Sequence, residues 1–176
     1  RMIHATADFT LADSTRFSPC AVDAAAAALT RGSVIYADSA MIRAGLSLAR
    51  LRVACPGYLA EHVLCHVADA DVSREAAEAG LPRSLFAVRK ARRKLDGAIA
   101  VFGNAPVALL ELNRMVIEEN VRPALVIGMP VGFVHVIESK QELTGLDVPW
   151  IVVEGRRGGS TLAVAALHAL CGVCHG

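Results

Sequence analysis

The sequence is poor in the features that mark several large functional classes. Only 5% of its 176 residues are aromatic, and Trp150 is the single tryptophan, which leaves little material for a base-stacking surface. The 18 Lys and Arg residues are nearly balanced by 17 Asp and Glu, so the net charge of +1 creates no basic field for nucleic acid. Although 54% of the residues are hydrophobic, no apolar run reaches the roughly 18 residues that a transmembrane helix needs.

The chain also lacks the cysteine pattern of a secreted, disulfide-bonded protein. Its cysteines are odd in number and irregular in spacing, and no signal peptide is visible. They are Cys20, Cys55, Cys65, Cys171 and Cys174. We therefore expect reduced thiols and a cytoplasmic protein.

Short β-branched segments alternate with longer stretches rich in Ala and Leu. This alternation is typical of βαβ units, and the strand segments lack the polar alternation of half-exposed strands. We predict a single α/β domain in three layers, with a mostly parallel sheet covered by helices on both faces. The expected strands are residues 33–37, 62–67, 98–102, 124–127 and 150–153, and residues 2–9 are a further candidate.

The predicted helices lie between these strands. Ser18 and Pro19 mark the start of the first one, because serine caps helices and proline is favoured in the first turn. Pro82 is expected to break a long helical stretch into two pieces. The predicted helical stretches are residues 19–31, 74–95, 106–119, 134–142 and 161–171.

The loops that follow the strands are the candidate ligand site, because open α/β sheets bind ligands beyond the carboxyl ends of their strands. These loops are residues 38–41, 103–106, 128–133 and 155–160. In the last of them, glycines precede a serine that opens a helix, so backbone N–H groups could face an anion. A plain tight turn explains these glycines equally well, and their spacing matches no nucleotide-binding fingerprint.

Two other loops carry similar alternatives. Residues 128–133 place two glycines and a proline around apolar residues, which suits either a flat apolar ligand or an ordinary βα turn. In residues 103–106, Asn104 and Pro106 could simply start a helix.

Histidine and cysteine motifs give further candidates. His4 can share a proton near neutral pH, although a lone histidine is more often structural. His62 and His66 are four residues apart, and on a strand this spacing is too wide for one metal ion. The chain ends in a C-x-x-C-H haem motif, but we expect its last helix to end at Gly172, followed by a loose tail without haem or metal.

Seven segments together resemble the precorrin-8X methylmutase family, which includes the enzymes that act on cobalt-precorrin-8. They follow the family's order and span nearly the whole chain. The segments are RMIHA at residues 1–5, DSAMIRAG at 38–45, PRS at 82–84, FGNAPVAL at 102–109, GMPVGF at 128–133, ESK at 138–140 and GRRGGS at 155–160.

The chain departs from the family pattern at several positions. Ala7 stands near the histidine where glycine is usual, and Pro82 and Val107 stand where threonine is common. His135 occupies a position where small or amide residues are commoner. The family also has an N-terminal segment before the histidine motif, and we expect that residues 1–176 form a methylmutase-like domain lacking this segment.

The resemblance implies an isomerase of cobalamin biosynthesis. Such enzymes move a methyl group from C-11 to C-12 of precorrin-8X or cobalt-precorrin-8, giving hydrogenobyrinic or cobyrinic acid, without a cofactor or a protein-bound metal. By the resemblance, His4 is catalytic and shares a proton with a ring nitrogen. The implied ring-binding residues are Arg83 as a carboxylate clamp, Gly158, Gly159 and Ser160 as a second anion site, and Ser84, Asp38, Met41, Asn104, Met129, Val131 and Phe133.

The resemblance also implies partners. Family members are homodimers with the ligand near the subunit interface, so we expect a twofold dimer that binds a corrinoid ring and neither nucleic acid nor a membrane. An alternative is a non-catalytic carrier of the intermediate or product. An NAD-dependent oxidoreductase on a similar sheet is disfavoured because its glycine fingerprint is absent.

Overall fold

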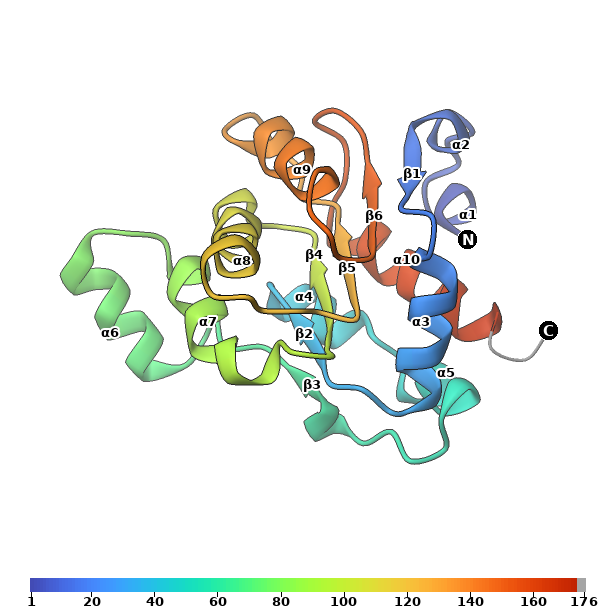
Figure 1. The fold of residues 1–176 in the computed structure, drawn as a ribbon, viewed down its shortest axis with the longest axis horizontal. Coiled ribbons are helices and arrows are strands. Elements are labelled where there is room, and N and C mark those ends of the chain that lie inside the picture. The colour runs from blue at the N-terminus through green and yellow to red at the C-terminus, as the bar shows by residue number, and fades with distance from the viewer. Residues whose placement is uncertain (174–176) are drawn as a thin grey trace.

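A mostly parallel sheet forms the centre of the molecule (Figure 1). The computed structural model describes residues 1–173, and within them six strands pair in the order β1-β6-β5-β4-β2-β3. All neighbours are parallel except β1 and β6. The strands are β1 (Thr15–Phe17), β2 (Ile35–Ala37), β3 (Val63–Leu64), β4 (Ile99–Phe102), β5 (Leu125–Gly128) and β6 (Trp150–Val153).

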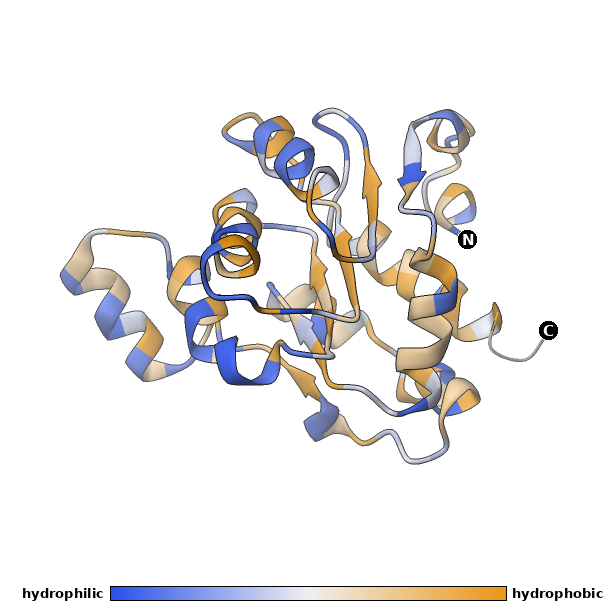
Figure 2. Ribbon diagram, viewed as in Figure 1, coloured by the Kyte–Doolittle hydropathy of each residue, from blue (hydrophilic) through white to orange (hydrophobic). Residues whose placement is uncertain are grey.

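Helices cover both faces of this sheet, which confirms the predicted three-layer architecture. Successive strand side chains point to opposite faces, so Ile35 enters one core and Tyr36 the other. The first face carries α3 (Ala21–Thr30), α4 (Ala40–Gly45), α5 (Leu48–Ala54) and α10 (Ser160–Val173). The second face carries α7 (Arg83–Ala91), α8 (Pro106–Glu118) and α9 (Val136–Thr144). Figure 2 shows apolar strands between these layers.

Shorter elements complete the described chain. The helix α6 (Ala70–Ala79) packs against α7, and α1 (Met2–Thr6) packs against α10. The others are α2 (Leu11–Ser14) and the 3₁₀ turns η1 (Ala60–His62) and η2 (Arg92–Lys94). No helix among residues 1–173 is long and apolar enough to cross a membrane.

Four of the predicted strands are confirmed with small shifts at their ends, as β2, β4, β5 and β6. The prediction for residues 62–67 is wrong over most of its length, because β3 has only two residues. His62 instead ends η1, where its Nδ1 accepts a hydrogen bond from the Leu59 backbone N–H (3.1 Å). His66 follows the strand and binds Asp69 (2.9 Å). Local side-chain hydrogen bonds thus replace the expected strand.

The N-terminal prediction is also wrong, because residues 2–6 form a helix instead of a strand. The edge strand β1 was not predicted. It has three residues and pairs with β6 in the register of Thr15 with Val153. Three residues are too few to show the alternation of apolar and polar side chains that predicts a strand. This segment is a strand because it pairs with β6.

The predicted helices are largely confirmed. The long stretch 74–95 is broken at Pro82 as expected, although its first helix begins earlier, at Ala70. The short helices α2, α4 and α5 were missed. The expected end at Gly172 is wrong, since α10 continues to Val173. The Cys174 and His175 of the haem motif lie outside the described residues.

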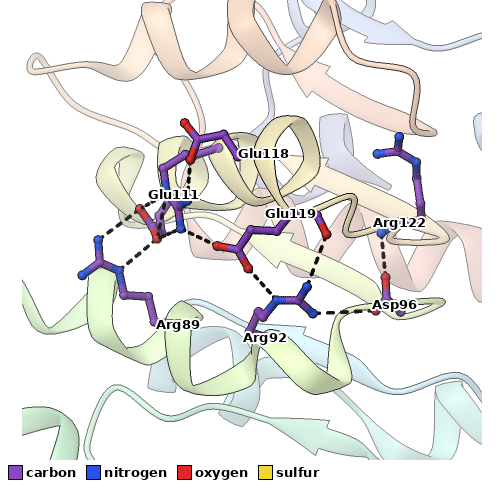
Figure 3. Close-up of polar contacts among 8 residues, drawn as sticks. Arg89, Arg92, Asp96, Glu111, Glu118, Glu119 and Arg122 are labelled. Carbon is purple, nitrogen blue, oxygen red and sulfur yellow. Dashed lines mark hydrogen bonds and ion pairs between the residues drawn. The ribbon is translucent and has the colours of Figure 1, made fainter.

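A network of ion pairs joins α7 and η2 to α8 (Figure 3). The carboxylate of Glu111 is only 6% exposed and accepts hydrogen bonds from Arg89 (2.9 Å) and Arg114 (2.7 Å). Glu119 binds Arg92 (2.6 Å) and Arg114 (2.7 Å). The helix α8 begins just after β4, and the segment that follows α8 returns to the residues before β4, where the Arg122 backbone N–H donates to Asp96 (2.8 Å).

Candidate active site

The loops after β2, β4, β5 and β6 meet at one edge of the sheet, because these strands are parallel and in register. Ala37 lies beside Val101, and Gly128 lies between Phe102 and Val152. The predicted site loops are therefore neighbours in space. We call this region the carboxyl edge and define it by residues 38–41, 103–106, 128–133 and 154–160.

Asp38 organises the carboxyl edge from within. Its carboxylate is 1% exposed and accepts hydrogen bonds from the backbone N–H groups of Gly103 (3.2 Å), Asn104 (2.9 Å) and Ala105 (2.8 Å). Burial raises the pKa of Asp38, and these three hydrogen bonds act in the opposite direction. The carboxylate is thus occupied with shaping the turn before α8, while Asn104 is exposed on that turn.

Two serines join the loop after β2 to the start of α10. The hydroxyls of Ser39 and Ser160 are 3.0 Å apart, and Ser39 also caps α4 through the Ile42 backbone N–H. Gly103 packs against the same point, since a Cβ there would lie 2.7 Å from the Ser160 Cα. The side chain of Ser160 is therefore buried, and its hydroxyl is hydrogen-bonded within the protein.

The glycines of the last loop are required by close packing. The Gly159 N–H donates to the Met129 carbonyl (2.8 Å), and a Cβ on Gly158 would collide with the same oxygen. This favours close packing as the reason for Gly158. The expectation that the Met129 side chain faces a ring is wrong, because this side chain is fully buried in the core.

Two hydrogen bonds from the Lys140 side chain stabilise this loop. Its Nζ donates to the carbonyls of Gly155 (2.9 Å) and Arg157 (2.7 Å), and the residue is only 3% exposed. Burial lowers the pKa of Lys140 to about 8. Lys140 lies in one of the segments that resemble the family, but local sequence patterns do not show its role, because both carbonyls come from residues well beyond its own helix.

His4 lies on α1, and residues that follow this helix contact the loop. The side chain of His4 is exposed. Ala7 ends α1 in the left-handed conformation with φ 53°, and Asp8 then forms an ion pair with Arg157. The segment that carries His4 is thereby fixed to the glycine loop.

Some of the exposed apolar side chains lie at the carboxyl edge. Phe133 is 88% exposed, and Met41 and Val131 are also exposed. Arg83 and Ser84 lie farther along the chain, at the start of α7, where Arg83 is exposed and Ser84 half-buried. The edge thus offers apolar contact area beside polar groups, which suits a large ligand with apolar and charged parts.

No group of three or more His, Cys, Asp or Glu side chains in residues 1–173 could hold a metal ion. His135 is exposed at the start of α9 with φ 58°, and His168 is half-buried in α10. The exposed apolar and polar side chains of the carboxyl edge can bind and orient a ligand, and an exposed histidine can exchange protons with it.

Comparison with known proteins gives a consistent result. The precorrin-8X methylmutase family model matches residues 1–173. The chain is 42% identical to cobalt-precorrin-8 methylmutase of Priestia megaterium, over 97% of this chain and 73% of that protein. It is also 42% identical to precorrin-8X methylmutase of Pseudomonas aeruginosa, with coverage of 97% and 80%. The crystal structure of the Thermus thermophilus precorrin-8X methylmutase superimposes with a TM-score of 0.88 at 48% identity, covering 98% of this chain and 81% of that one.

Proposed function

Since the chain belongs to the precorrin-8X methylmutase family, it is a methyl-migrating isomerase of cobalamin biosynthesis, and we propose that its reaction takes place at the carboxyl edge, beside His4. The observation that carries this location is the ion pair between Asp8 and Arg157, which holds the His4 segment against the glycine loop. The substrate is a corrinoid ring, precorrin-8X or its cobalt form.

We infer that His4 shares a proton with a nitrogen of the ring. In the reaction one carbon–carbon bond to the methyl group breaks at C-11 and another forms at C-12, so no electrons enter or leave the ring. A proton held at a ring nitrogen favours the arrangement of double bonds from which the methyl group migrates. An exposed imidazole on a fixed helix suits this task, because it is open to a ligand.

The ring is proposed to lie against the exposed apolar side chains of Met41, Val131 and Phe133. Polar contacts to its acidic side chains would come from the edge of this surface and from α7. These contacts are assigned to Asn104, Arg83, Ser84 and the backbone of Gly158 and Ser160, whereas the Gly159 N–H is already bound to the Met129 carbonyl. Asp38 contributes indirectly, by holding the turn that presents Asn104.

A second copy of the chain would complete the site. Phe9 and Phe133 are 79% and 88% exposed, and a monomer gains nothing from exposing such side chains. We propose a twofold homodimer that covers part of this surface with the ring near the interface. The thiols of Cys20, Cys55 and Cys65 suit a reducing, cytoplasmic location.

Replacement of His4 tests the catalytic assignment. His4→Ala is expected to lower the rate of methyl migration at least about a hundredfold, as loss of a positioned proton-sharing group does. The rate is followed by the absorption change from precorrin-8X to product, and circular dichroism checks that the fold is retained. His135→Ala is the matched control, because this histidine is also exposed beside the carboxyl edge and should be dispensable.

Two outcomes would contradict the proposal. Turnover retained in both His4→Ala and the double variant with His135→Ala would remove both histidines from the reaction. Wild-type protein that binds the ring without converting it would be a carrier instead of an isomerase.

A further inference from the structure

A basic pocket lies between α1, α5 and α10, on the first face of the sheet. It has a volume of about 270 Å³, and the polar side chains that line it among residues 1–173 are Arg1, Arg50 and His168. The rest of its wall is small or apolar, from Val53, Ala169, Cys171 and Gly172. In Figure 1 these helices lie on the opposite side of the molecule from α6 and α7.

The positive charge of this pocket is not neutralised by the part of the chain that the structure describes. No Asp or Glu lines it, and neither Arg1 nor Arg50 forms an ion pair with a residue in 1–173. By contrast, Arg89, Arg92 and Arg114 in the α7–α8 network all bind carboxylates. Unpaired guanidinium groups gathered in one hollow are a typical anion site.

His168 is the third polar residue that lines the pocket among residues 1–173. Its Nε2 accepts a hydrogen bond from the Ser47 backbone N–H (3.0 Å), so the neutral ring carries its proton on Nδ1. The charged groups that face His168 are Arg50 from α5 and Arg1 beside α1, and together with burial they lower the pKa of His168. The pocket therefore combines two guanidinium groups with an imidazole ring whose pKa is lowered.

The pocket is connected to His4 through α1. The Ala5 N–H donates to the Arg1 carbonyl (2.9 Å), so Arg1 is part of the first helical turn. Residues three apart lie on the same side of a helix, which places Arg1 and His4 as neighbours along one side of α1. Arg1 thus links the pocket to the helix that carries His4.

We propose that the pocket of Arg1, Arg50 and His168 is a carboxylate subsite that receives one acidic side arm of the corrinoid ring. The inference rests on the proposed function, which supplies a ring with several acidic arms. A volume of about 270 Å³ admits one acetate or propionate arm and excludes the macrocycle. Bound there, the arm would fix the rotation of the ring over His4.

Arg50→Gln tests the subsite without touching His4. We expect the affinity for hydrogenobyrinic acid, measured by absorbance titration, to fall about ten- to a hundredfold, as loss of a charge-assisted hydrogen bond does. The KM for the substrate should rise in parallel while kcat changes less than twofold, because this contact is made equally before and during migration. Arg74→Gln, which removes the same charge from exposed α6, is the control and should leave both quantities unchanged.

Esterified product separates a carboxylate contact from a structural effect. With the acidic arms of hydrogenobyrinic acid converted to methyl esters, wild type and Arg50→Gln should bind the ring equally. In wild type, the acid form should raise the pKa of His168, observed by NMR, and the ester should not. An Arg50→Gln penalty that persists with the ester would overturn the proposal.

The same titrations separate this subsite from the proposed function. Product affinity and the pKa of His168 can both be measured without turnover. A protein that does not catalyse the reaction would therefore still support or overturn the carboxylate subsite. Equal product affinity in wild type and Arg50→Gln, with inorganic phosphate raising the pKa of His168, would assign the pocket to a free anion and overturn the proposal.

Discussion

Two buried carboxylates in different regions of the molecule are stabilised by different kinds of hydrogen-bond donor. Asp38 at the carboxyl edge is surrounded by backbone N–H groups, whereas Glu111 in the α7–α8 network is surrounded by guanidinium groups. Both are nearly inaccessible to water, at 1% and 6% exposure. The carboxyl edge is thus shaped by uncharged dipoles and close backbone contacts, and the α7–α8 network by charges (Figure 3).

The two carboxylates respond to pH with opposite sign. Burial raises the pKa of Asp38, so the folded chain takes up this proton at higher pH than the unfolded chain, and stability from this group increases as the pH falls through the folded value to the unfolded value. Burial acts in the same direction on Glu111, but hydrogen bonds from Arg114 and Arg89 outweigh it and lower its pKa. Stability from Glu111 is therefore present above its unfolded pKa and is lost as the pH falls through the folded value.

The largest expected effect comes from adding a methyl group at the carboxyl edge. Gly158→Ala should lower the free energy of unfolding by about 3 kcal/mol, because the new Cβ collides with the rigid Met129 carbonyl. Denaturant unfolding measures this change. Gly172→Ala is the matched control, since no atom of residues 1–173 outside its own helix lies within 4 Å of its Cβ position, and it should not destabilise the protein. Equal stability of the two variants would refute close packing as the basis of the edge.

Replacement of one acceptor oxygen of Asp38 should have the next largest effect. Asp38→Asn leaves three backbone donors competing for one carbonyl oxygen, which should cost about 2 kcal/mol of stability. Asp96→Asn is the control, because Asp96 accepts one backbone N–H at the exposed Arg122. Thermal unfolding of both variants distinguishes them, and a loss no greater than that of Asp96→Asn would contradict the organising role of Asp38.

A smaller, salt-dependent effect is expected in the α7–α8 network. Glu111→Gln should lower stability by about 1 kcal/mol at neutral pH, because its guanidinium partners are partly exposed and solvent screens the loss. The difference should shrink in 1 M salt and at acid pH, where the wild-type carboxylate loses its charge. Unfolding curves across pH and salt check this. If the difference in stability between wild type and Glu111→Gln did not depend on salt, charges would not stabilise this network, and the contrast with Asp38 would be wrong.

The smallest effect should be a gain in stability. Ala7 has φ 53°, a conformation that glycine adopts at no steric cost, so Ala7→Gly should stabilise the fold by about 0.5 to 1 kcal/mol after its larger unfolded-state entropy is included. Ala5→Gly, within the helix α1, is the control and should destabilise by a similar amount. Losses of equal size in both variants would show that Ala7 is not strained in solution.

The sequence by itself determined the class of the fold and the family. Continuous apolar segments separated by helical stretches predicted β2, β4, β5 and β6 and the layers around them, since doubly covered parallel strands require that pattern. The glycine-rich loops also placed the carboxyl edge correctly, because all parallel strands end there. Pro82 predicted the break between α6 and α7, because proline cannot donate inside a helix.

Only the tertiary structure decided what individual side chains in those loops do. Asp38 and Met129 look like ligand residues in the sequence, yet one binds backbone N–H groups and the other fills the core. Lys140 and the pair of Asp8 with Arg157 depend on residues far apart in the chain meeting in space. The partners of each of these side chains come from distant parts of the chain that pack together in the fold. Local sequence patterns do not encode such packing, so the roles of these side chains could be assigned only from the tertiary structure.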